Sequence, residues 1–253
     1  MSRGLAESAE SVRVGALPGH GAVIAVPGPY PTDLSYTGRD DKADYVSRKY
    51  APILRGSVLD VGCDTRRLRA LIASPERYVG VDMGPPADVA LNLDRDELPG
   101  GRILPFEDRS FDTVVCTDVL EHLERCHRVF DELCRVGRDR VIVSLPNPVG
   151  NLIGEIFRGG LGRMKYYGLP VDPPGDRHRW FFGFEEAAEF LVVRGRRRGF
   201  EVEQLDAERV SGLYWLVGKD QRDALDSPNV QCGTTWCVLR RAQAARATPG
   251  GEA

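Results

Sequence analysis

The stretch SVLDVGCDTRRLRALIASPERYVGVD, residues 57–82, decides the fold of this chain. It opens on a short apolar run at Ser57–Val61, and a second such run, Arg77–Asp82, closes it. Between the two runs, the apolar residues of 68–72 follow helical spacing, and Gly62 separates the first run from that helix. Two short apolar strands joined by a helix are typical of a βαβ unit, in which the strands are parallel.

The same alternation continues along the chain. Apolar runs at Thr113–Thr117 and Arg140–Leu145 predict strands, and residues 120–136 between them predict a helix. Strands that are apolar throughout are typical of a parallel sheet covered by helices on both faces. The remaining expected elements are a helix that begins at Asp41 and ends before Gly56, a helix at Glu185–Arg198, and strands at Phe200–Leu205 and Thr234–Leu239.

Three segments fall outside this alternation. Residues 1–40 are rich in glycine and proline, which predicts an irregular arm with one short strand near Val23–Val26. Residues 147–182 are long for a connection, so we expect a lid over a functional site, inserted in a single domain of residues 41–241. The small, polar residues 242–253 predict a disordered tail.

The composition excludes several classes of protein. The chain has 253 residues, of which 42% are hydrophobic and 28% charged, as in ordinary globular proteins. The net charge of -3 disfavours a nucleic-acid partner or an anionic lipid surface. Prolines interrupt the longest uncharged stretch, so we expect no membrane span. We also expect no secretory signal and therefore a cytoplasmic protein. We expect the six cysteines to be reduced core residues: Cys63, Cys116, Cys126, Cys134, Cys232 and Cys237.

The ends of the first two strands are where a ligand is expected. Open parallel sheets bind ligands at the carboxyl ends of their strands. The loop DVGCDTRRL, residues 60–68, offers a glycine that lets a ligand approach the backbone and a helix start that favours an anion. Asp82 ends the second strand about 20 residues after Gly62, where a carboxylate commonly accepts hydrogen bonds from a ribose. The pattern therefore predicts a nucleoside ligand.

Four segments resemble class I S-adenosylmethionine-dependent methyltransferases of the type 11 group in order and spacing. They are VLDVGCD, YVGVDM, LPFEDRSFDTVVCTDVLEHL and VIVSLPN, which begin at residues 58, 78, 104 and 141. The resemblance covers residues 41–206 and implies an α/β, Rossmann-like fold whose sheet has seven strands, mostly parallel, with one antiparallel. It also implies S-adenosylmethionine as cofactor and S-adenosylhomocysteine as product. A second motif, KYYGLP followed by DRHRWFF within residues 165–182, resembles the lid of a bacterial subgroup.

The resemblance also implies which residues bind the cofactor, all of them near the carboxyl ends of strands. The methionine part is expected against Asp60, Gly62 and Cys63, the ribose on Asp82, and the adenine beside Met83 and Asn92 or Leu93, while Thr117 and Asp118 face the transferable methyl. The family's second and third loop glycines are replaced here by Asp64 and Arg66. An added carboxylate is unfavourable beside the cofactor's own unless Arg66 or Arg67 pairs with one of them.

Methyl transfer from a sulfonium mainly requires alignment of nucleophile, methyl and sulfur, because the leaving group departs neutral. A hydroxyl or ammonium acceptor must also lose a proton to a base. The candidate catalytic residues are His178, Asp118, His122 and Asp176, with Tyr166 and Tyr167 as positioning groups. His122, Cys126, His127 and Cys134 share one predicted helix without the paired spacing of structural zinc sites, so we expect no metal.

These observations lead to one hypothesis and two alternatives. The first is a methyltransferase that acts on a small molecule: a sugar, a glycan precursor or a specialised metabolite. The second is an enzyme of the same fold redirected to elimination or cyclisation, because the glycine loop is altered at Asp64 and Arg66. The third is a non-catalytic binding protein. The sequence leaves open whether the chain is a monomer or a homodimer, and which atom accepts the methyl.

Overall fold

The computed structural model describes residues 26–73, 75–157, 166–209 and 227–243. The strand expected near Val23–Val26 lies almost wholly outside these residues, as do Lys165 of the expected lid and most of the expected tail. Among the helices that the structure describes, not one has the length and apolar character needed to cross a membrane.

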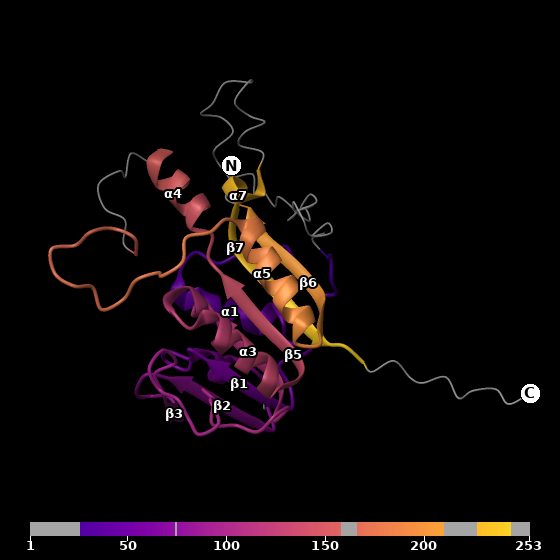
Figure 1. Ribbon diagram of the computed structural model, residues 1–253. Coiled ribbons are helices and arrows are strands. Elements are labelled where there is room, and N and C mark those ends of the chain that lie inside the picture. The colour runs from indigo at the N-terminus through magenta and orange to yellow at the C-terminus, as the bar shows by residue number, and fades with distance from the viewer. Residues whose placement is uncertain (1–25, 74, 158–165, 210–226, 244–253) are drawn as a thin grey trace, which may run out of the picture.

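Seven strands form one sheet in the order β3-β2-β1-β4-β5-β7-β6 (Figure 1). Neighbouring strands from β3 to β5 are parallel, and β7 runs antiparallel to both β5 and β6. The expected mostly parallel sheet with one antiparallel strand is therefore confirmed. The strands are β1 (Ser57–Val61), β2 (Arg77–Asp82), β3 (Val89–Ala90), β4 (Phe111–Thr117), β5 (Gly137–Leu145), β6 (Phe200–Arg209) and β7 (Cys232–Arg241).

Helices cover both faces of the sheet, because its strands are apolar on both sides. One core cluster joins α3 (Cys126–Val136) and α5 (Phe184–Arg197) to the sheet, and these helices lie in front of it in Figure 1. A second cluster joins α1 (Arg39–Lys49) and α2 (Arg67–Leu71) to the other face, around the buried Trp236. The six cysteines are buried thiols, as expected. Two further helices, α4 (Pro148–Phe157) and α7 (Pro228–Gln231), contact each other beyond β7.

The helix expected at residues 120–136 is wrong in one respect, because the structure divides it. A 3-10 turn, η1 (Leu120–His122), comes first, and α3 begins only at Cys126. Between them Leu123 is extended, and the carboxylate of Asp94 accepts hydrogen bonds from the amides of residues 124 and 125. His122 therefore stands in a turn directly after β4 rather than in the first turn of a long helix.

The segment expected as a lid contains regular structure. It begins with α4, whereas residues 166–183 have no helix or strand. The two-residue strand β3 was not predicted, because two residues are too short to show a periodicity. The bounds of β1 and β2 agree with the prediction at both ends.

Candidate active site

The loop that follows β1, at the carboxyl edge of the sheet, is shaped by four of its residues: Gly62, Cys63, Asp64 and Arg66. The amides of Gly62 and Cys63 both donate to the carbonyl of Val81, at 2.8 and 3.2 Å, which holds the loop against β2. Gly62 has a φ of +79°, a conformation that favours glycine. Asp64 and Arg66 also have positive φ, of 45° and 60°. The backbone thus keeps a glycine-like path at the two positions where the sequence no longer has glycine.

Asp60 is buried at the end of β1, with 5% of its surface exposed. The hydroxyl of Tyr78 donates to its carboxylate at 2.5 Å. Burial raises the pKa of Asp60 to about 6, although the Tyr78 hydroxyl opposes this shift by stabilising the charged form. Asp60 is therefore an anion at neutral pH that gains a proton in mildly acidic solution.

Asp82 and Met83 lie at the end of the neighbouring strand, β2. The amides of Asp64 and Met83 donate to the two Asp82 carboxylate oxygens at 2.8 and 2.7 Å. Each oxygen keeps acceptor capacity for a further donor. Met83 is 74% exposed, and the Asn92 amide nitrogen lies 3.9 Å from its sulfur, whereas Leu93 is buried in the core. An oriented carboxylate thus stands beside an exposed apolar side chain.

The two arginines of the loop pair with carboxylates on other segments. Arg66 lies 2.8 Å from Asp88, which also accepts a hydrogen bond from the amide of Gly80. Arg67 pairs with Asp44 of α1 at 2.6 Å. The helix that follows, α2, has only five residues, so it provides a weaker dipole for an anion than the sequence led us to expect.

Asp118, which follows Thr117 at the end of β4, is already paired. Its carboxylate accepts a hydrogen bond from the Ser144 hydroxyl at 2.6 Å and forms an ion pair with Lys42 of α1. Asp118 also has a positive φ, of 52°. An aspartate held by a lysine is a weaker base than an unpaired one.

Three of the other candidate catalytic residues meet on the turn η1 and the segment that covers it. His122 Nδ1 lies 2.6 Å from an Asp176 carboxylate oxygen. The ring of His178 lies 4.5 Å from that of His122 and stacks on Tyr166 at 4.2 Å. The Tyr167 hydroxyl is 3.0 Å from His178 Nδ1. Five residues from the sequence prediction thus form one cluster: His122, His178, Asp176, Tyr166 and Tyr167.

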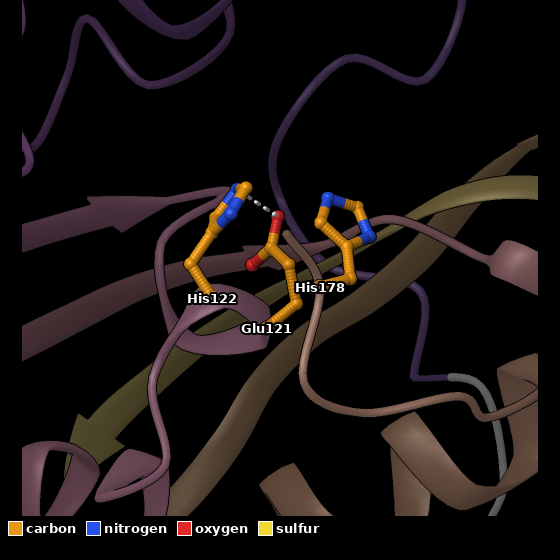
Figure 2. Close-up of side chains that lie close together, drawn as sticks. All are labelled: Glu121, His122 and His178. Atoms are coloured by element: carbon orange, nitrogen blue, oxygen red, sulfur yellow. Dashed lines mark ion pairs between the residues drawn. The ribbon is translucent and has the colours of Figure 1, made fainter. Parts of the chain in front are cut away.

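Glu121 is a member of this cluster that the sequence prediction missed. Its side chain is 1% exposed, and neither carboxylate oxygen has a hydrogen-bond partner within the described parts of the chain. One of these oxygens lies 3.6 Å from His122 Nε2, and Figure 2 shows the carboxylate between the two imidazoles. Burial raises the pKa of Glu121 to about 8. The only available signal was its place in the VLEH motif, where a glutamate would ordinarily be read as solvent-exposed.

Two hydrogen bonds fasten the covering segment to η1. The amide of Arg179 donates to the Glu121 carbonyl at 2.7 Å, and the Trp180 indole donates to the Leu123 carbonyl at 2.7 Å. Beside these contacts is a hollow of about 460 Å³, lined by Glu124, Arg177, His178, Arg179 and Trp180. His178 is therefore held over the end of β4 and borders a space of small-molecule size.

Residues 59–144 match a family model described as "Methyltransferase domain". This match coincides with β1 to β5 and with every strand end described above. The part of the chain from β1 to β5 is therefore similar to methyltransferase domains. The fold predicted from the four motifs is confirmed, and the match agrees with the family that they predicted.

Solved structures similar to this methyltransferase domain have low sequence identity. The small RNA methyltransferase HEN1 is 18% identical, with a TM-score of 0.50 over 83% of this chain and 27% of that one. Magnesium protoporphyrin IX methyltransferase from Synechocystis PCC 6803 is 16% identical, with a TM-score of 0.44 over 80% and 83%. The [4+2]-cyclase SpnF is 16% identical, with a TM-score of 0.48 over 87% and 88%. A search of curated proteins finds no match. At 18% identity, the match to HEN1 shows a shared fold alone.

The chain thus presents two groups of side chains at the carboxyl edge of its sheet. One group lies at the ends of β1 and β2 and contains most of the predicted cofactor residues. The other lies after β4 and contains the two histidines and Glu121. Asp118, although predicted with the second group, pairs with Lys42 and Ser144.

Proposed function

We propose that this chain transfers a methyl group from S-adenosylmethionine to a small molecule. The observation that carries the proposal is the pair of strand ends at β1 and β2. Gly62 keeps the loop close to β2, and the backbone orients the carboxylate of Asp82 beside it. In a methyltransferase domain, such a carboxylate is placed to accept hydrogen bonds from the two ribose hydroxyls of the cofactor.

The other proposed cofactor contacts follow from the same placement. The ammonium of the methionine part would pair with Asp60, next to the backbone of Gly62 and Cys63. Met83 would pack on the adenine, whose edge would face Asn92 or the backbone of Leu93. Thr117 would face the transferable methyl, together with Asp118.

A small acceptor is supported by the hollow beside His178 and by the net charge of the chain. The hollow of about 460 Å³ is within the range of small-molecule sites. The net charge of -3 gives no general attraction for a nucleic acid. Transfer of labelled methyl to sugars and metabolites, with an RNA transcript as competitor, tests this choice. Methylation of the RNA and of none of the small molecules would contradict it.

Replacing Asp82 by alanine is expected to weaken S-adenosylmethionine binding at least about 100-fold. The reason is the loss of charge-assisted hydrogen bonds to the ribose, each worth about 1.5–3 kcal/mol. Calorimetric titration with S-adenosylmethionine and with S-adenosylhomocysteine measures the change.

Glu107→Ala is the matched control for that experiment. Glu107 is a carboxylate with an 85% exposed side chain, and it lies before β4, at the opposite edge of the sheet. Its replacement should leave cofactor binding unchanged. Equal affinities of the Asp82→Ala variant and the unmodified chain would contradict the proposed ribose site. Tight cofactor binding without methyl transfer to any acceptor would favour the redirected enzyme or the binding protein.

Cofactor affinity is expected to fall about tenfold per pH unit below about pH 6 and to level off near pH 7. Burial raises the pKa of Asp60 to about 6, so the carboxyl is protonated below that pH and must release its proton to pair with the ammonium. Cofactor binding is therefore weak below the pKa of Asp60 and strengthens as the pH rises through that pKa. Titrations of S-adenosylhomocysteine between about pH 5 and 7 measure the profile.

Tyr78→Phe is the matched variant for the pH profile. The Tyr78 hydroxyl donates to the Asp60 carboxylate and lowers its pKa, so removal of the hydroxyl should move the midpoint to higher pH. A flat profile in the unmodified chain, or a midpoint that moves to lower pH in the variant, would remove Asp60 from the proposed ammonium site.

A further inference from the structure

Glu121, His122 and His178 bring three potential metal ligands together from two segments of the chain. One ligand atom from each lies within 4.8 Å of the other two. Glu121 and His122 come from the turn after β4, and His178 comes from the segment fastened over that turn (Figure 2). Donors bound to one ion at about 2.0–2.2 Å are at most about 4.4 Å apart. A shift of a few tenths of an ångström in these ligand atoms would therefore bring all three within bonding distance of one ion.

The buried carboxylate of Glu121 is the observation that points to a cation. The side chain is 1% exposed, yet both oxygens lack a hydrogen-bond donor among the residues that the structure describes. A buried carboxylate in this state is costly, and proteins ordinarily hold such a group by ion pairing or by metal coordination. One of these oxygens faces the His122 ring, as the dashed line in Figure 2 shows.

The second partner of each histidine suits metal binding as well. His122 Nδ1 lies 2.6 Å from Asp176, and its other nitrogen, Nε2, lies 3.6 Å from Glu121. The Asp176 contact is a charge contact without hydrogen-bond geometry. A carboxylate beside the far nitrogen, once hydrogen-bonded to it, would fix the orientation of the ring in a metal site. His178 Nδ1 is 3.0 Å from the Tyr167 hydroxyl, which makes Nε2 its ligand atom.

We propose that Glu121, His122 and His178 bind one divalent transition-metal ion, with Asp176 positioning His122. Two imidazoles and one carboxylate suit Zn²⁺, Mn²⁺ or Fe²⁺, and three protein ligands leave coordination positions open. An oxygen of the methyl acceptor would occupy an open position beside the end of β4; this extension rests on the function proposed above. This proposed site differs from our expectation from the sequence that the chain binds no metal. That expectation was based only on the histidines and cysteines of residues 122–134.

Metal titration of the full chain, dialysed against a chelator and kept without S-adenosylmethionine, tests the site. Calorimetry with Zn²⁺ and with Mn²⁺ should show one ion per chain. Glu121→Gln and His178→Ala should each weaken binding at least about 100-fold, and Asp176→Asn about tenfold. His127→Ala and Glu124→Gln are the matched controls, because they replace a histidine and a glutamate near the cluster but outside it.

The visible spectrum of the Co²⁺-loaded chain identifies the ligands. Nitrogen and oxygen ligands give ligand-field bands, which should disappear in His178→Ala while far-UV circular dichroism stays unchanged. A thiolate charge-transfer band would place the ion on a cysteine and overturn the proposal. Absence of binding, or binding that survives both Glu121→Gln and His178→Ala, would overturn it equally.

Failure of the metal site and failure of the methyltransferase proposal are distinguishable. The cofactor contacts assigned to β1 and β2 do not involve Glu121 or His178. S-adenosylhomocysteine should therefore bind the chelator-treated chain and its His178→Ala variant with unchanged affinity. Metal binding without cofactor binding would support the metal site and contradict the proposed function. Cofactor binding without metal binding would support the proposed function and contradict the metal site.

Discussion

Replacing Asp206 by alanine is expected to lower the free energy of unfolding by about 3–5 kcal/mol. Asp206 on β6 holds the ammonium of Lys49 through both carboxylate oxygens, at 2.8 and 2.7 Å. Lys49 is 1% exposed and lies at the end of α1, among the rings of Tyr45, Tyr50 and Trp236. Loss of the carboxylate leaves this ammonium buried without its counter-charge. Urea unfolding followed by circular dichroism measures the change.

Lys49→Met separates the buried charge from the packing of the side chain. Methionine keeps an apolar stem among the rings, and the remaining carboxylate of Asp206 is 13% exposed and still accepts a hydrogen bond from Gln204. This variant should therefore lose less stability than Asp206→Ala. The double variant with Asp206→Asn should also be more stable than Asp206→Ala alone, since it buries no unpaired charge. If the stability lost by the double variant equalled the sum of the losses of Lys49→Met and Asp206→Asn measured singly, the two groups would not interact.

The parts of the fold that were predicted well are those in which local pattern and burial agree. Ser57–Val61 and Arg77–Asp82 are short apolar strands with a neighbouring strand on each side, so their bounds are visible in the sequence. At the sheet edge, β6 continues to Arg209 through polar residues that carry no apolar signal. The break between η1 and α3 depends on Asp94, a residue from a distant loop, and no local pattern contains it.

The candidate site was predictable in position but not in its pairings. Topology alone places Asp60, Asp82 and Asp118 at one edge of the sheet, because parallel strands end there together. The Lys42 partner of Asp118 comes from α1, and this contact depends on how the helix packs across the sheet. Burial of Glu121 likewise depends on the covering segment, which contacts η1 through Arg179 and Trp180. Such tertiary contacts leave no local signal in the sequence.

Gly62→Ala is expected to cost about 2–5 kcal/mol of stability and to abolish measurable cofactor binding. The φ of +79° costs about 1–2 kcal/mol for a residue with a side chain. The new methyl would also stand 2.2 Å from Cγ2 of Val119, an overpacking that costs about 1–3 kcal/mol more. Relief requires movement of the loop, and this loop carries the proposed contacts to the methionine part. Urea unfolding and calorimetric titration with S-adenosylhomocysteine measure the two effects.

The double variant Gly62→Ala, Val119→Ala divides the cost between its two causes. Shortening Val119 removes the Cγ2 atom that the new methyl would meet, so the stability lost through overpacking should be recovered. The stability lost through the positive φ at position 62 should persist. Val119→Ala alone is the reference for the cavity that this shortening creates. If the alanine at position 62 cost less than about 1 kcal/mol in either background, the loop after β1 would not have the left-handed turn described here. Its place beside Asp82, and with it the proposed cofactor site, would then be wrong.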